Sequence, residues 1–218
     1  MKLTYIGHST FLLEAGGTTI LIDPFNEKVG YPVPKVSPSA VLISHEHGDH
    51  NHLAMAQGQP RVIRGLEAGE WRAVPEQIDG IAISAVPTYH DSTKGQERGR
   101  NTVFIVEVEG LRVVHLGDLG HGLDEASAGA VGRPDVLMIP VGGHYTIDAT
   151  QAHAVVAHLR PGIVVPMHYK TEVNPGSPIS TLDAFLAAAK GSKSVGHTVT
   201  VERGAVPRET EIWVMTWR

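Results

Sequence analysis

The sequence predicts a single α/β (α+β) domain that spans residues 1–218, and three observations support this fold class. Most apolar segments are short, rich in β-branched residues and bounded by glycine, proline or aspartate, as is typical of strands. Segments with helical periodicity are fewer and fall mainly in the second half of the chain. The 218 residues, 42% of them hydrophobic, suffice for one core, and no linker divides the chain.

The expected strands follow one another along the chain. The opening segment 2–23 contains two or three strands joined through the turn residues 15–17. Glu109-Gly110 separates two apolar runs, and this spacing predicts a tight hairpin. Strands are expected over 18–23, 39–44, 80–86, 101–108, 111–116, 135–140 and 162–167, with at least one more in 197–217.

Helices are expected where apolar residues recur every three or four positions after a capping residue. The clearest covers 148–160, with Asp148 as its cap. Another covers 180–190, where Ser180 and Asp183 form a capping-box-like start. We further expect a shorter helix around 123–131, one or two helical turns over 66–72, and mobile polar loops of unassigned role over 91–100 and 171–180.

Composition excludes several kinds of protein. The chain has no cysteine, which excludes disulfides, a thiolate nucleophile and cysteine-ligated zinc. A net charge of −5 argues against a polyanion-binding surface, so nucleic acid is not an expected partner. No apolar run reaches the roughly 20 residues of a membrane span, and the first residues lack the apolar core of a signal peptide. We therefore expect a cytoplasmic protein without membrane association, and homo-oligomerisation stays open.

Histidine is unusually frequent, with 13 copies, and several follow the expected strands directly. If these strands share one direction, the polar residues after them lie along one edge of the fold. Functional residues concentrate on such loops because a rigid scaffold positions them. The groups that follow a strand in this way are Asp23, the segment 45–50, His90, Asp118, His144 and His168.

The densest of these groups is the segment His45-Glu46-His47-Gly48-Asp49-His50. Gly48 lets the chain curl, so that His45 and His47 can hold one metal ion while Asp49 and His50 hold a second. Imidazole and carboxylate ligands suit zinc, manganese or iron. The segment therefore predicts a metal centre rather than a surface loop with incidental histidines.

This segment resembles the HxHxDH signature of the metallo-β-lactamase superfamily, and residues 3 to about 170 keep the resemblance in the same order. The resemblance implies a four-layered αβ/βα sandwich with the metals at one edge between two sheets. It implies that His90 completes the first metal site and His168 the second, with Asp118 bridging both metals. It also implies that Asp23 supports the site.

The segments 7–10, 115–118 and 140–143 look most like the small hydrolase branch that includes ascorbate-6-phosphate lactonase-like proteins. This implies a metal-dependent hydrolase with two divalent ions, zinc in first place and manganese or iron as alternatives. The ions would activate a hydroxide against a small-molecule ester, lactone or phosphoester, with Asp49 as the residue that orients the water and accepts its proton. The alternatives are a nuclease or cyclic-nucleotide phosphodiesterase, and a non-catalytic metal-binding protein on the same scaffold.

Other residues are expected around the metals. His8 and His115 are expected to support the ligands through hydrogen bonds, and His144 to contact the substrate. Lys170 either meets an anionic substrate or is solvated. Arg98 and Arg100 are expected in a solvated loop after His90, and the alternative is that this loop folds over the site. The remaining histidines are expected to be packing or surface residues: His52, His121, His153, His158 and His197.

Overall fold

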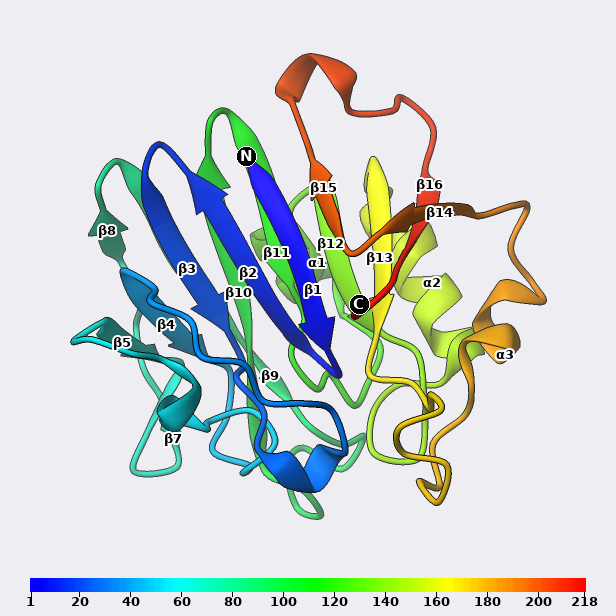
Figure 1. Cartoon of the computed structure of the whole chain (residues 1–218). Helices are drawn as coiled ribbons and strands as arrows, with labels where there is room; N and C mark the ends of the chain where they lie inside the picture. The colour runs from blue at the N-terminus through cyan, green and yellow to red at the C-terminus, as the bar shows by residue number, and fades with distance from the viewer.

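Two β-sheets lie face to face at the centre of the computed structural model, which describes all 218 residues (Figure 1). The first sheet contains β1 (Lys2–Gly7), β2 (Thr10–Ala15), β3 (Thr18–Ile22), β4 (Ala40–Ile43), β5 (Arg61–Arg64) and β15 (Thr198–Thr200). The second contains β8 (Glu76–Ile78), β9 (Ile81–Tyr89), β10 (Arg100–Val108), β11 (Leu111–His115), β12 (Val136–Pro140), β13 (Ile163–Met167), β14 (Lys193–Gly196) and β16 (Glu211–Met215). Their spatial orders are β15-β1-β2-β3-β4-β5 and β14-β16-β13-β12-β11-β10-β9-β8.

The main core lies between the two sheets and contains 27 buried residues from both. Strand β4 is apolar throughout because its successive side chains point to opposite faces of the sheet and both faces are buried. Ala40 and Leu42 enter the core between the sheets, whereas Val41 and Ile43 pack into a smaller cluster on the outer face. A strand that is buried on both faces must be a continuous apolar run.

The outer layers differ between the two sheets. Helices α1 (Glu125–Val131), α2 (Ala149–Leu159) and α3 (Leu182–Leu186) pack on the second sheet around a cluster of 20 buried residues. Loops and two short 3-10 turns, η1 (Glu27–Val29) and η2 (Leu53–Met55), cover the first sheet around Phe25 and Tyr31. The predicted α/β class is confirmed, and none of the helices is long and apolar enough to cross a lipid bilayer.

The strands that precede the predicted site residues share a direction within each sheet. In the first sheet β3 and β4 are parallel. In the second, β11, β12 and β13 are parallel, and β9 runs the same way because β9 and β11 are both antiparallel to β10. The loops that follow these strands gather at the lower end of the sandwich in Figure 1. The shared edge expected from the sequence is therefore present.

The helical turns predicted over 66–72 are wrong, because this segment forms a small hairpin of β6 (Leu66–Glu67) and β7 (Glu70–Trp71). The two turn residues, Ala68 and Gly69, have φ of 51° and 81°. Two successive left-handed residues form the turn that suits a two-residue hairpin. The Trp71 indole N–H then donates to backbone carbonyls of β9 and β10, which fixes the hairpin to the second sheet.

The predicted helix over 180–190 is shorter than expected and begins after Thr181. The backbone N–H of Ser180 donates to the carbonyl of Gly142 at 2.7 Å, and its own carbonyl accepts from the backbone of Lys170 at 2.9 Å. These two bonds hold Ser180 in the loop layer, so it cannot serve as the helix cap.

The prediction of a helix over 148–160 is confirmed, with α2 covering Ala149–Leu159. The Asp148 carboxylate accepts from the backbone of Gln151 at 2.9 Å, and the Gln151 side chain accepts from the backbone of Asp148 at 3.1 Å. This capping box satisfies two backbone N–H groups that have no partner inside the helix.

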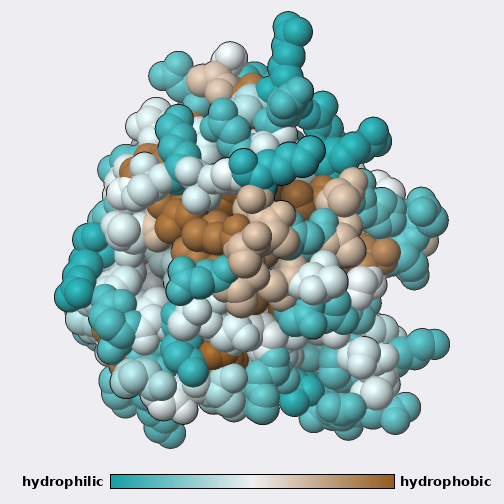
Figure 2. Space-filling model, turned by 90° about the vertical axis from the view of Figure 1, so that its right-hand side faces the viewer, coloured by the Kyte–Doolittle hydropathy of each residue, from teal (hydrophilic) through white to brown (hydrophobic).

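An apolar patch remains open on the face that carries α2, α3 and β16 (Figure 2). A groove of about 810 Å³ lies here, beside the C-terminal end of α2, whereas the N-terminal end of α2 adjoins the loops at the lower edge. Its floor and rim contain Val156, Ala157, Ala188, Ala189, Ile212, Arg133, Arg160, Lys190 and Arg208. The groove is thus remote from the predicted site.

We predict that Asp148→Ala lowers the free energy of unfolding by about 1 kcal/mol, because the first turn of α2 loses its cap. Urea denaturation followed by circular dichroism measures this difference. Thr150→Ala, an exposed position in the same turn, serves as the matched control and is expected to change stability little. Equal effects of the two substitutions would contradict the assigned cap.

Candidate metal centre

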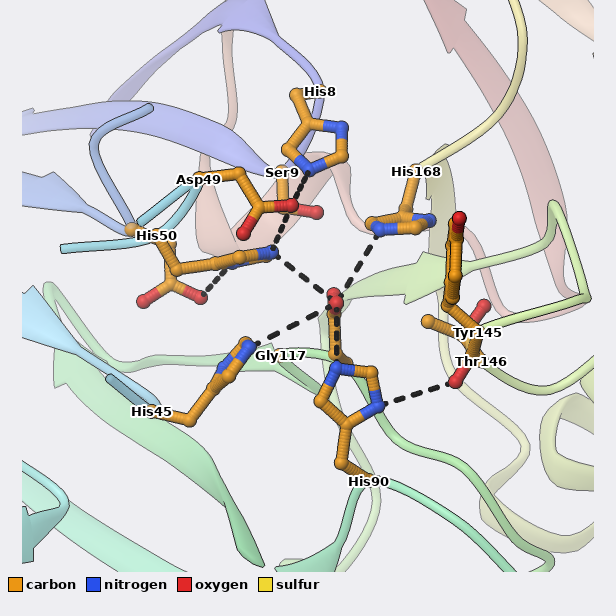
Figure 3. Close-up of polar contacts among 12 residues, drawn as sticks. His8, Ser9, His45, Asp49, His50, His90, Gly117, Tyr145, Thr146 and His168 are labelled. Carbon is orange, nitrogen blue, oxygen red and sulfur yellow. Dashed lines mark hydrogen bonds and ion pairs between the residues drawn. The ribbon is translucent and has the colours of Figure 1, made fainter. Parts of the chain in front are cut away.

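The structure brings the predicted ligands together around the carboxylate of Asp118, which is only 2% exposed. Its Oδ2 lies 3.2 Å from Nε2 of His50 and 3.2 Å from Nε2 of His90. Nε2 of His168 and of His45 lie 3.3 Å and 3.9 Å from the same oxygen. Figure 3 shows these four rings converging on one point, with His45 and His50 from the loop after β4, His90 from the end of β9 and His168 from the end of β13.

The ligand atoms form two groups on either side of this carboxylate. His45, His47 and His90 offer atoms that all lie within 4.8 Å of one another. Asp49, His50 and His168 form a second group of the same kind, together with His8. This division of the segment 45–50 is the one expected from the sequence. His8, expected only in a supporting role, instead lies among the ligand atoms of the second group.

Asp23 holds two of the histidines in position from behind. Its buried carboxylate accepts a hydrogen bond from Nδ1 of His50 at 3.0 Å and two more from the backbone N–H and hydroxyl of Ser44. The Ser44 oxygen in turn accepts from Nδ1 of His45 at 2.9 Å. Such partners fix the tautomer and leave each Nε2 lone pair free to point at the centre. Ser44 was not anticipated, because its role depends on Asp23, which lies 21 residues away in the sequence and is brought close only by folding.

His90 is oriented in the same way by the backbone. Its Nδ1–H donates to the carbonyl of Tyr145 at 3.1 Å, so its Nε2 also faces the centre. Nε2 of His45, Nε2 of His50 and Oδ1 of Asp118 are buried without a hydrogen-bond partner. Leaving a buried polar atom unpaired costs about 1–3 kcal/mol. These inward-facing nitrogen and oxygen atoms are the donor set that a divalent cation needs, so the residues fit a metal centre.

The electrostatics of the site favour the ligand forms of His45, His8 and Asp118, but the protonated form of His50. Burial lowers the pKa of His45 well below its usual value, and burial together with His168 lowers the pKa of His8 to about 4. Burial opposes the ionised form of Asp118, but His168 and His50 hold its pKa well below the usual range. Burial also opposes protonation of His50, yet Asp118 raises the pKa of that ring. The buried carboxylate thus requires positive charge beside it.

His115 supports the site and cannot itself be a ligand. Its Nε2–H donates to the carbonyl of Ser9 at 2.8 Å, and its Nδ1 accepts from the backbone of Gly117 at 3.1 Å. Both ring nitrogens are therefore used. The ring connects the turn between β1 and β2 to the loop after β11, so it braces one sheet against the other at the site.

Asn101 and Gly117 set the position of Asp118, and of these two only Gly117 belongs to a motif that the sequence analysis singled out. The Asn101 side chain accepts from the backbone of Asp118 at 3.0 Å and donates to the carbonyl of Leu116 at 2.9 Å. Gly117 has φ of 56°, and a Cβ there would lie 2.3 Å from the Asn101 oxygen. Only glycine permits this close approach.

A pocket of about 270 Å³ opens over the two ligand groups. It is lined by His47, Asp49, His90, Arg98, Asp118, Tyr145 and His168. Arg98, which we expected in a solvated loop, lines this pocket instead. His144 and Lys170, the predicted substrate contacts, do not line it: the His144 ring lies against Tyr145, with centroids 4.4 Å apart. Tyr145, 40% exposed at the pocket, was not anticipated.

Known proteins resemble this chain in sequence and in fold. The family model of the beta-lactamase superfamily domain matches residues 2–168. A UPF0173 metal-dependent hydrolase of Archaeoglobus fulgidus is 33% identical over an alignment of 198 positions, and the match covers 78% of this chain and 84% of the relative. One from Pyrococcus abyssi is 33% identical over an alignment of 193 positions, and the match covers 78% of this chain and 85% of the relative.

A solved structure from Thermotoga maritima, a candidate zinc-dependent hydrolase of the metallo-β-lactamase superfamily, matches with a TM-score of 0.80 and 36% identity. The match covers 98% of this chain and 97% of the other. The sandwich and its histidine-rich edge are therefore of the metallo-β-lactamase type, as the sequence predicted. The chain belongs to this superfamily and, within it, to the UPF0173 family of metal-dependent hydrolases.

We predict that Ser44→Ala weakens metal binding about 10–100-fold, because His45 and Asp23 lose the partner that orients them. Competition with a chromophoric zinc chelator measures the affinity. Ser84→Ala, on the exposed surface of β9, is the matched control and is expected to leave the affinity unchanged. An unaltered affinity in Ser44→Ala would show that this contact does not orient the site.

We predict that metal removal lowers the melting temperature by about 5–10 °C. A ligand at about 100 times its Kd stabilises a fold by about 2.7 kcal/mol, and each kcal/mol shifts the melting temperature of a chain of this size by about 2–4 °C. Scanning calorimetry with and without chelator measures the shift, and added Zn²⁺ should reverse it. Identical transitions would contradict the centre.

Proposed function

We propose that this chain is a hydrolase with two divalent cations, zinc in first place and manganese or iron as alternatives, that cleaves a small ester, lactone or phosphoester. The observation that carries this proposal is the pair of ligand groups on either side of a buried carboxylate. His45, His47 and His90 would hold one cation, and Asp49, His50 and His168 the other. Asp118 would be shared between them.

When bound, two such cations lower the pKa of a water molecule toward about 7 and polarise the oxygen of the scissile group. Asp49 is placed to orient that water, because its carboxylate lines the pocket and its side chain is 39% exposed. Burial favours its neutral form, but His50 and His8 hold its pKa well below the usual range. Asp49 is therefore ionised and can accept a hydrogen bond from that water, while the His8 ring nitrogen lies 3.2 Å from its Oδ2.

The rest of the pocket supports attack by water rather than by the protein. No serine, threonine or cysteine lines it, so no side-chain nucleophile of those types is at hand. Tyr145 and Arg98 form the remaining walls and can contact the substrate. A volume of about 270 Å³ suits a small molecule.

Cytoplasmic location and self-association remain predictions from the sequence.

Two alternatives use the same scaffold, namely a nuclease or cyclic-nucleotide phosphodiesterase and a non-catalytic metal-binding protein. The first requires a basic surface that follows a phosphate backbone, which the net charge of −5 does not favour. The second leaves unexplained why five of the proposed ligands, His47, Asp49, His90, Asp118 and His168, line an open pocket. A substrate panel that includes esters, lactones, phosphodiesters and single-stranded RNA separates the three.

We predict that the protein loaded with Zn²⁺ or Mn²⁺ hydrolyses one or more simple members of that panel, and that His47→Ala lowers kcat/KM at least about 100-fold, since loss of one orienting or charge-stabilising group is commonly this costly. His52→Ala is the matched control, because His52 lies two residues after the segment 45–50 and outside both ligand groups. Steady-state kinetics measure both. No turnover of any substrate, or equal effects of the two substitutions, would overturn the proposed function.

A further inference from the structure

A second cleft, of about 410 Å³, adjoins the metal pocket and has features that the proposed hydrolysis alone does not require. The two hollows share His47 and Arg98, so a molecule held over the metal ligands can extend into the cleft. Only one of the eleven residues that line the cleft is hydrophobic, whereas three are cationic: Lys94, Arg98 and Arg100. The cleft is thus built to hold a polar group.

The single acidic residue that lines the cleft is already paired. The Glu46 carboxylate lies 2.5 Å and 2.7 Å from Nη1 of Arg64, outside the lining. Arg100 is also engaged, since it pairs with Glu70 at 2.9 Å and stacks over Trp71. The charge of each of these arginines is balanced by its glutamate partner. Lys94 and Arg98 therefore set the charge of the cleft.

Lys94 and Arg98 are the available cations. Lys94 is exposed and makes no ion pair or side-chain hydrogen bond. The Arg98 guanidinium pairs with Glu97 at 3.2 Å and lies 5.7 Å from the centroid of the Tyr145 ring. The pair with Glu97 is solvent-exposed, and such pairs contribute roughly 0–1 kcal/mol, so Arg98 can exchange it for another anion.

The loop that carries both cations is fixed from inside by the buried carboxylate of Asp91. One oxygen accepts from the backbone and hydroxyl of Thr93 and from the backbone of Gly95, at 2.8–2.9 Å. The other accepts from the backbones of Glu97 and Arg98, at 3.1 Å and 2.8 Å. Five hydrogen bonds to one carboxylate give the loop a defined shape directly after His90. Preorganisation of this kind lowers the entropic cost of binding.

We propose that this cleft is the subsite for an anionic group of the substrate, a carboxylate or a phosphate, bound by Lys94 and Arg98. The inference rests on the proposed function, in which the scissile bond lies over the metal ligands. The substrate is then a small molecule with a hydrolysable bond at one end and a negative charge at the other. Arg98 borders both hollows, so it contacts the anionic group and the region next to the scissile bond.

The test compares two p-nitrophenyl esters of equal chain length, the pentanoate and the hydrogen glutarate, which differ by a terminal carboxylate. A hydrogen bond to a charged group contributes about 1.5–3 kcal/mol, which corresponds to about a 10–150-fold preference. We expect the metal-loaded protein to favour the glutarate ester in kcat/KM by about this factor. Lys94→Ala and Arg98→Gln should each reduce the ratio about tenfold, and the double variant should bring it close to 1.

Lys190→Ala, an exposed lysine at the remote groove, is the matched control and should keep the ratio of the unsubstituted protein. Raising the salt concentration should reduce the preference for the glutarate ester in the unsubstituted protein only. A ratio near 1 without any substitution, or a preference that survives in the double variant, overturns the subsite.

Binding of the corresponding 4-nitroanilides, which resist hydrolysis, separates this inference from the proposed function. Isothermal titration should show tighter binding of the glutaric than of the pentanoic anilide, and loss of this difference in the double variant. If the difference is found but no ester is hydrolysed, the subsite stands and the proposed ester hydrolysis is wrong. If both anilides bind equally to the unsubstituted protein, the subsite is wrong whatever the kinetics show.

Discussion

A carboxylate that is buried among imidazole rings is the constraint on which the rest of the site depends. Asp118 is 2% exposed, and a buried charge is costly unless positive groups or hydrogen-bond donors surround it. Four imidazole nitrogens approach one of its oxygens from loops that follow β4, β9 and β13. The strand ends of both sheets must therefore lie close together at this point, and the hydrogen bond from His115 to Ser9 holds the two sheets in that position.

Backbone conformation at the strand ends shows how the fold turns side chains inward. His8, Asp23 and His168 follow or nearly follow a strand, and each has a positive φ, of 53°, 46° and 52°. Residues other than glycine adopt this conformation at a cost of roughly 1–2 kcal/mol. The protein tolerates this cost because the large core between the sheets fixes the strands. The positive φ turns these three polar side chains toward the site at the edge of the sandwich. Such local strain is concentrated where function requires a particular side-chain direction.

The sequence predicted the parts of the fold that depend on local pattern. Strands buried on both faces are continuous apolar runs, and the two residues of the α2 capping box, Asp148 and Gln151, lie within four positions of the sequence. It missed β5, β8 and β14, which are short and polar because each lies at or near the margin of its sheet. In the site, ligand-type residues could be recognised by their spacing. Ser44, Asn101 and Tyr145 could not, because their roles depend on partners that only folding brings close.

The metal ligands are fixed by the fold, whereas the surface that would bind the substrate is formed by loop side chains. The loop after His90 starts and ends at this ligand, since the backbone of His90 donates to the carbonyl of Gly99 at 3.0 Å. Between these points Asp91 determines the loop's shape by binding backbone N–H groups. The side chains at positions 94 and 98 therefore do not hold the loop in shape. Substitutions at those two positions can alter what is bound without moving a ligand. A rigid edge with replaceable loop side chains is how one scaffold can serve different substrates with one centre.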